Sequence, residues 1–191
     1  MEAVNFVLGG LGGQGILFMT KVLAQCAVDK GISVMGAETH GMAQRGGSVV
    51  SHLRLGCVRS SLIEPGSAHF VLALEENEAY RNLGFLANRA RLYANSRGNH
   101  FPRAEVKDFL RKREILCRSV PAGKIAMEMR VPMASNLALI GYFSAFGEGP
   151  MSGEDLRSTI GRISPDRFRE MNFRVFDAAY KIGAKEVAGA Q

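Results

Sequence analysis

Residues 4–15, VNFVLGGLGGQG, decide how this chain folds. The first five, Val4–Leu8, form a short apolar run of β-favouring residues, which predicts a strand. Gly10, Gly12 and Gly15 follow in the spacing G-x-G-x-x-G, and a helix-like pattern begins directly after them. Glycine permits left-handed backbone and close approach, and free amides at a helix start attract anions. The stretch therefore predicts either a phosphate-binding turn or a tight structural turn.

Strand-like and helix-like segments alternate after this turn. Apolar residues at helical spacing predict a helix over 14–30, ended by a left-handed cap at Gly31. Strands are predicted over 33–37, 48–55, 69–74, 91–94 and 115–120, with a helix over 75–86. Residues 69–74 are continuously apolar, which is typical of a strand buried on both faces.

From Pro121 onward the pattern becomes helical. We expect an apolar helix over Ser135–Phe146, a helix opened by a capping box at Ser152, and a last helix from Ser164-Pro165 toward Ala188. The whole order predicts an α/β fold in three α/β/α layers, with a Rossmann-like, mostly parallel sheet and a helical C-terminal third. We expect one domain over residues 1–191.

Composition excludes several classes of protein. The apolar content of 47% and the charged content of 22% are those of a folded domain, not of a disordered chain. The longest charge-free run, Ala3–Thr20, is too polar and glycine-rich for a membrane span, and no basic region of a secretory signal precedes it. Three scattered cysteines, Cys26, Cys57 and Cys117, form no disulfide or metal framework. We expect a cytoplasmic protein.

The net charge of +6 is concentrated between Arg89 and Arg118, a segment that contains nine lysines and arginines but only three acidic residues. A solvated surface explains such a dispersed cluster, and a basic face for an acidic protein or an anionic ligand is the functional alternative. Nucleic acid is not expected, because no recognition helix or RNP-type aromatic pattern accompanies the charges.

A second motif occupies residues 38–48, ETHGMAQRGGS. Glu38 lies near the end of a predicted strand, where a ribose-binding acid would sit in a dinucleotide-binding protein. The purely structural alternative is an ion pair between Glu38 and Arg45 that holds the loop in place. Since the glycines at 41, 46 and 47 permit close approach of another backbone, a protein interface is an equal alternative.

The chain closely resembles the gamma subunit of the 2-oxoacid:ferredoxin oxidoreductases, including the small subunit of indolepyruvate ferredoxin oxidoreductase. Four stretches carry the resemblance: GGLGGQG at 9–15, ETHGMAQRGGSVVSHLR at 38–54, FVLALEENEAYRNL at 70–83 and SNLALIG at 135–141. The likeness runs from about Asn5 to Gly183. At one point the chain departs from it, because His69 stands where the resemblance leads us to expect an aspartate.

The resemblance implies one subunit of an enzyme that oxidatively decarboxylates a 2-oxoacid to its acyl-CoA and passes electrons to ferredoxin. It implies thiamine diphosphate, Mg²⁺, iron–sulfur clusters and coenzyme A in the complex, held mainly by thiamine-binding and ferredoxin-like partner subunits. The residues agree, because the chain lacks a G-D-G thiamine signature and its cysteines cannot ligate a cluster. We expect no cofactor on this chain alone and no turnover by it.

We assign no catalytic residue and no metal ligand. The two motifs are expected to line a face against the partner subunits, where Arg45, His40 and free amides near the glycine turn hold an anion such as a coenzyme A phosphate. Gln44 and Glu38 would orient the loop, and Asn136 would cap a helix or bind backbone. The full set of candidate residues is Gly10, Gly12, Gly13, Gln14, Gly15, Glu38, His40, Gln44, Arg45, Gly46, Gly47 and Asn136.

Two alternatives stay open at this point. A free-standing NAD(P)-binding protein would explain the glycine spacing and Glu38, but the helical last third offers no clustered acid–base set as a substrate domain. A non-catalytic assembly module would need only an association surface. If the chain is a subunit of a complex, its isolated form should form a homodimer or expose an apolar face.

Overall fold

The computed structural model describes residues 1–40, 46–97 and 100–189, with only the backbone at residue 40. Within these ranges a six-stranded sheet has the order β2-β3-β1-β4-β5-β6. β3 runs antiparallel to β1 and β2, and β1, β4, β5 and β6 are parallel neighbours. The strands are β1 (Val4–Leu11), β2 (Val34–His40), β3 (Ser48–Leu55), β4 (Ala68–Ala73), β5 (Leu86–Asn95) and β6 (Leu116–Val120).

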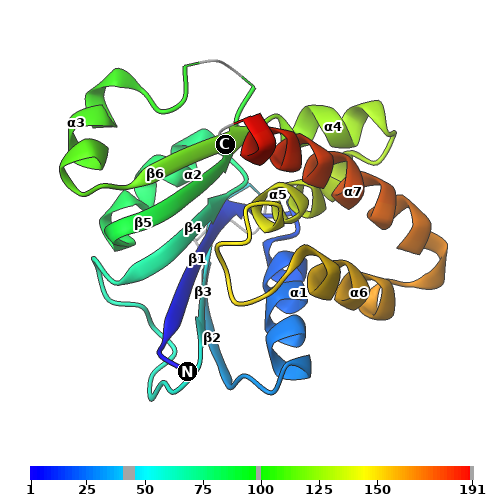
Figure 1. Cartoon of the computed structure of the whole chain (residues 1–191), viewed down its shortest axis with the longest axis horizontal. Helices are drawn as coiled ribbons and strands as arrows, with labels where there is room; N and C mark the ends of the chain where they lie inside the picture. The colour runs from blue at the N-terminus through cyan, green and yellow to red at the C-terminus, as the bar shows by residue number, and fades with distance from the viewer. Residues whose placement is uncertain (41–45, 98–99, 190–191) are drawn as a thin grey trace.

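Helices cover both faces of this sheet (Figure 1). They are α1 (Ile16–Asp29), α2 (Glu76–Arg81), α3 (Ala104–Lys112), α4 (Ala122–Glu128), α5 (Ser135–Ser144), α6 (Gly153–Ile163) and α7 (Asp166–Gly189), with 3-10 turns η1 (Leu83–Phe85) and η2 (Pro132–Ala134). The larger core joins the sheet to α1 and α4–α7, and the smaller core joins it to α2 and α3. The predicted three-layer α/β fold is confirmed.

The side chains of β4 contribute to both cores. Phe70 and Leu72 belong to the larger core, whereas Val71 and Ala73 belong to the smaller one, because successive side chains leave a strand on opposite faces. The strand predicted to be buried on both faces is therefore confirmed. At its start, the ring nitrogen Nδ1 of the unexpected His69 accepts a hydrogen bond from the Asn5 amide at 3.0 Å.

Several predicted local signals act as expected. α1 is followed by Gly31 in left-handed backbone, with φ of 72°. Ser152 and Asp155 form a capping box at the start of α6. In the C-terminal third, a Cβ on Gly141 of α5 would lie 2.3 Å from the Phe176 carbonyl oxygen of α7, so only glycine allows these two helices to approach so closely.

Other expectations about the elements were wrong. The predicted helix over 75–86 is a short α2 followed by η1, because the Asn82 side chain donates to the Glu78 carbonyl oxygen at 2.8 Å and Leu86 already pairs with Ala68. β5 has ten residues where four were predicted. The prediction missed α3, although Val106, Phe109 and Leu110 have the i, i+3, i+4 spacing of an amphipathic helix.

Candidate functional site at the carboxyl edge of the sheet

The glycine turn lies where the carboxyl ends of the parallel strands meet. β1 runs on to Leu11, which pairs with Ser48 of β3, so Gly10 is part of the strand and not of the turn. A Cβ on Gly10 would lie 2.8 Å from the Ile16 side chain, which begins α1. The turn itself is residues 12–15, where Gly13 and Gly15 have φ of 95° and 80°. These two positions require left-handed backbone, which favours glycine.

Gln14 closes the turn and connects it to the segment that follows β4, the parallel neighbour of β1 in the sheet. Its Oε1 accepts the Leu11 amide at 2.8 Å, and its Nε2 donates to Glu75 Oε1 at 2.6 Å. Glu75 lies two residues after the end of β4 and is the N-cap residue of α2. The sequence prediction missed Glu75, although its place directly after the strand predicted over 69–74 could have indicated it. The candidate Gln14 thus acts on the main chain and on a neighbouring carboxylate.

The backbone amides of the turn are only partly free. The Gly12 amide donates to the Gly47 carbonyl oxygen at 2.9 Å, and the Gln14 amide donates to the Leu11 carbonyl oxygen at 3.1 Å. Among the described residues, the Gly13 and Gly15 amides have no such acceptor. Of the expected row of free amides, only those of Gly13, Gly15 and the first turn of α1 therefore remain.

Asn136 joins the turn to the start of α5. Its Nδ2 donates to the Gly15 carbonyl oxygen at 3.0 Å, and its Oδ1 accepts the Leu137 amide at 2.8 Å. The side chain is buried, and a Cβ on Gly15 would lie 2.5 Å from its Nδ2. Of the two expected roles, binding backbone across a contact is the one observed, because α5 has no side-chain cap.

The second motif is only partly brought to this site. Gly47 contacts Gly12, and Gly46 has φ of 74°. Glu38 is exposed on β2 and pairs with Ser51 of β3. Gln44 and Arg45, like the rest of 41–45, lie outside the described residues, so the Glu38–Arg45 ion pair is not described. His40 ends β2.

Sheet order separates Glu38 from the glycine turn. β3 lies between β1 and β2, which places Glu38 about 10 Å from β1 in the plane of the sheet. A ribose-binding acid belongs on the strand next to β1. The expected ribose-binding position of Glu38 is therefore wrong for this sheet, and this weakens the dinucleotide alternative.

A buried carboxylate anchors the start of β3. Glu78 of α2 is 1% exposed, accepts the Ser48 hydroxyl at 2.6 Å and forms an ion pair with Arg81 at 2.6 Å. Because Ser48 directly follows the two glycines of the second motif, this contact holds the end of that motif against α2. Sequence reasoning did not single out Glu78.

Two hollows open beside the turn. A cavity of about 200 Å³ is bordered by Gly13, Gln14, Glu75, Asn95 and Arg97. Across Pro132 and Met133 lies an apolar groove of about 550 Å³, with Phe18, Leu137, Phe168 and Met171 among its lining residues. The carboxyl edge thus combines a small polar cavity with a larger apolar groove.

The three cysteines and His52 do not line either hollow. Cys26, Cys57 and Cys117 are free thiols, and burial raises the pKa of Cys117 to about 11. Burial lowers the pKa of His52, whose Nδ1 accepts the Ile63 amide at 3.1 Å. In the described ranges no three His, Cys, Asp or Glu side chains are grouped so that they could hold a metal ion. None of the described helices has the length and apolarity to cross a membrane.

Fold and site together define an α/β domain with a glycine turn, a carboxylate and an apolar groove at the carboxyl edge of its sheet. The family described as pyruvate ferredoxin/flavodoxin oxidoreductase matches residues 5–182, and the chain belongs to this family. The indolepyruvate oxidoreductase subunit IorB of Archaeoglobus fulgidus is 32% identical, over 93% of this chain and 94% of its own length. The chain is therefore a member of a 2-oxoacid ferredoxin oxidoreductase subunit family, as predicted.

Solved structures show the same fold. A keto/oxoacid ferredoxin oxidoreductase gamma subunit from Geobacter sulfurreducens superimposes with a TM-score of 0.71 at 17% identity, covering 95% of this chain and 99% of that one. The 2-oxoglutarate:ferredoxin oxidoreductase of Magnetococcus marinus, solved with 2-oxoglutarate, coenzyme A and succinyl-CoA bound, has a TM-score of 0.76 at 18% identity. Here the match covers 97% of this chain and 32% of that longer one.

Proposed function

We propose that this chain is the gamma-type subunit of a thiamine diphosphate-dependent 2-oxoacid:ferredoxin oxidoreductase. The complex would oxidatively decarboxylate a 2-oxoacid to its acyl-CoA and pass the electrons to ferredoxin. The observation that carries the proposal is the end-to-end match to an indolepyruvate oxidoreductase subunit together with the family match over 5–182. Three free thiols favour a reducing compartment, so we place the complex in the cytoplasm.

We propose that the cofactors are held by partner subunits. The described residues do not fit Mg²⁺ or an iron–sulfur cluster, because they offer no group of three suitable donors. The polar cavity of about 200 Å³ is below the size of a typical ligand site and suits at most one phosphate of coenzyme A. Consequently we derive no reaction step on this chain and expect it to be inactive alone.

The contribution of this chain would be the surface that completes the complex. Leu17, Met127, Met133 and Phe168 are 39–68% exposed around the carboxyl edge. Exposed apolar side chains beside a groove are typical of protein interfaces. The turn that Gln14 and Asn136 hold in place would give this surface a fixed shape toward the thiamine-binding subunit.

The test is co-purification of the tagged full chain from its native host, with its companions identified by mass spectrometry. We expect thiamine-binding and ferredoxin-like subunits. Leu17→Lys should lose them, because Leu17 lies in the first turn of α1 and is 51% exposed. Val28→Lys is the matched control, since Val28 is 54% exposed on the last turn of the same helix, at the opposite end.

Activity then separates the subunit from an independent enzyme. The purified complex should oxidise a 2-oxoacid only with coenzyme A and an electron acceptor present, and the isolated chain should not. Decarboxylation by the isolated chain, or recovery of the chain without companions, would contradict the proposal. Equal loss of companions in both lysine variants would contradict the placement of the interface.

A further inference from the structure

A cavity of about 450 Å³ opens at the amino ends of β1, β4 and β5, away from the glycine turn. It exists because β5 contains a bulge. Ala68 of β4 pairs with Leu86 and Phe70 pairs with Arg91, so two steps along β4 match five along β5. Residues 87–90, which stand opposite the single residue 69, leave the ladder and line the cavity.

The bulge holds Arg89 in an unfavourable backbone conformation. Its φ is 61°, in the left-handed region that side chains with a Cβ rarely adopt. The conformation is held by the Arg89 amide, which donates to the Arg113 carbonyl oxygen at 2.8 Å, and by an ion pair from Arg89 Nε to Glu114 at 2.7 Å. Such outliers concentrate at binding sites.

Hydrogen-bond donors dominate the cavity wall. Arg89, Arg91, Asn88 and His69 line it, and Glu148 is the carboxylate among its lining residues. Because His69 Nδ1 accepts the Asn5 amide, a neutral ring carries its proton on Nε2 and is a donor there. Asn88 and Arg89 also border a second hollow, together with Lys112, Arg113 and Glu114.

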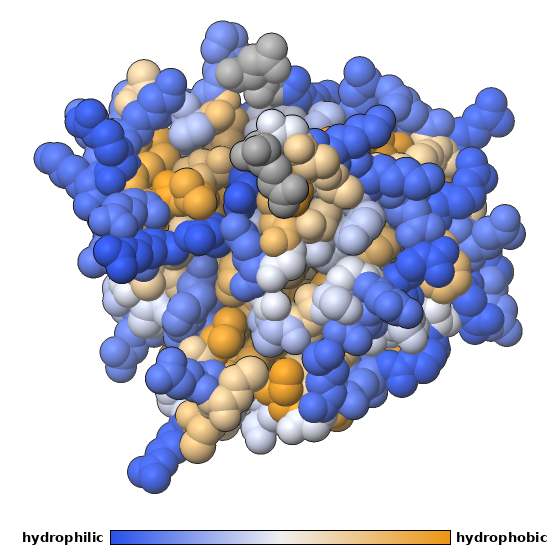
Figure 2. Space-filling model, viewed as in Figure 1, coloured by the Kyte–Doolittle hydropathy of each residue, from blue (hydrophilic) through white to orange (hydrophobic). Residues whose placement is uncertain are grey.

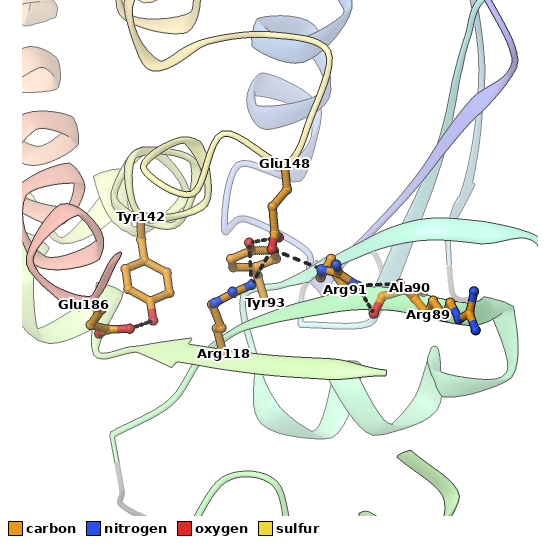
Figure 3. A network of polar contacts seen from close by, with 8 residues as sticks. All are labelled: Arg89, Ala90, Arg91, Tyr93, Arg118, Tyr142, Glu148 and Glu186. Carbon is orange, nitrogen blue, oxygen red and sulfur yellow. Dashed lines mark hydrogen bonds and ion pairs between the residues drawn. The ribbon is translucent and has the colours of Figure 1, made fainter. Parts of the chain in front are cut away.

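Glu148 does not supply free negative charge (Figure 3). Arg91 Nε donates to it at 3.0 Å and Arg118 Nη1 at 2.9 Å, and the Tyr93 hydroxyl donates to its second oxygen. Its carboxylate is thus already neutralised. Arg89 points away from this network and is 78% exposed, so the rest of its guanidinium is accessible.

We propose that this bulge cavity binds a small organic anion, a carboxylate or a phosphate monoester on a compact apolar body. The anionic group would lie against the part of the Arg89 guanidinium that Glu114 leaves free, and the apolar body against Val4, Phe70 and Pro150, which also line the cavity. Its volume lies within the range of small-molecule sites. This site is independent of the proposed enzyme function.

Binding of benzoate and phenyl phosphate to the purified full chain tests the proposal by calorimetry at constant ionic strength. Benzyl alcohol serves as the neutral probe. We expect at least one anion to bind in the millimolar range or tighter and the alcohol not to bind, and the two dissociation constants tell which anionic group is preferred. Chemical-shift changes confined to residue 4 and residues 69–70, 87–91 and 148–150 would place the ligand in the cavity.

Three variants make the test specific. Arg89→Gly removes the guanidinium while suiting the left-handed backbone, and should weaken anion binding about tenfold, the equivalent of one charge-assisted hydrogen bond. Asn88→Asp can still accept from Arg113 Nε but brings a negative charge, and should weaken binding at least as much. Arg130→Gly is the control, because Arg130 has the same left-handed backbone, with φ of 62°, outside the cavity.

The proposal fails if neither anion binds the wild-type chain, if benzyl alcohol binds as tightly as the anions, or if Arg130→Gly loses as much affinity as Arg89→Gly. Circular dichroism checks that each variant is folded. Because no turnover is measured, any of these failures leaves the proposed subunit function untouched.

Discussion

Gln14 shows how a single side chain gives the glycine turn its shape. It satisfies the Leu11 amide and donates to Glu75, and so connects the ends of β1 and β4. Glycines make the turn sterically allowed, but they do not select one conformation. The selecting contact spans 61 residues of sequence.

Replacement of Gln14 by glutamate should therefore destabilise the fold. Gln14→Glu removes the donor and sets a second carboxylate against Glu75 in a half-buried position. We expect a loss of about 1–3 kcal/mol in the free energy of unfolding at pH 7, measured by urea denaturation.

Gln25→Glu is the matched control for this change. Gln25 donates to Asp29 at 3.0 Å, so the substitution creates the same kind of carboxylate pair on the exposed side of α1. Solvent screens that pair, and its effect should stay below about 1 kcal/mol. Equal losses in the two variants would mean that the Gln14–Glu75 contact has no special role in the turn.

At the residue level, the sequence predicted which residues form turns and caps better than it predicted which residues contact one another. Gly13 and Gly15 were expected in the turn because their spacing is local, and Gly31 was expected as a cap for the same reason. Glu75 and Glu78 were missed, because their importance depends on strands and helices that are distant in sequence. Only the sheet order brings Glu75 to Gln14.

Among the elements, α6 offers a pH-dependent test. Asp155 accepts the Ser152 amide within the capping box, and Lys30 of the α1 cap donates to it at 2.6 Å. The Lys30 ammonium and Ser152 together lower the pKa of Asp155 to about 2. A carboxyl group whose pKa is lowered on folding stabilises the fold above its unfolded pKa, near 4, and this contribution disappears as the pH falls toward 2.

Asp155→Ala should cost about 1–2 kcal/mol of unfolding free energy at pH 7. Between about pH 4 and pH 2 the difference from wild type should narrow, because the wild-type protein loses the same contribution. Urea denaturation across this pH range measures both effects. Asp108→Ala, which removes an exposed ion pair with Arg111, should cost little at any pH. A difference for Asp155→Ala that stays constant down to pH 2 would contradict the role of its charge.

The order of the elements was harder to predict than the elements themselves. Ser48–Leu55 was predicted as a strand with its observed bounds, since its alternation is local. Its insertion between β1 and β2 could not be read from that pattern, because pairing partners are non-local. This insertion is what moves Glu38 away from the glycine turn and changes the meaning of an apparent dinucleotide motif.

On the scale of the whole molecule, charge and apolar surface are unevenly distributed. Polar and charged side chains dominate the rim of the face in Figure 2, with apolar patches between them. At the carboxyl edge, Met133 is 68% exposed and borders both the polar cavity and the apolar groove. A surface of this kind is normally covered in a complex.

The isolated chain should therefore associate with itself when no partner is present. We expect light scattering to give a mass above that of the monomer at high concentration, falling on dilution. Met133→Lys should return the monomer mass, because a charge in the middle of the apolar edge must be desolvated on association. Leu62→Lys is the control, since Leu62 is 56% exposed outside both hollows of the carboxyl edge. A wild-type chain that stays monomeric at every concentration would show that the apolar edge does not drive self-association, and a mass lowered equally by both substitutions would place the contact elsewhere.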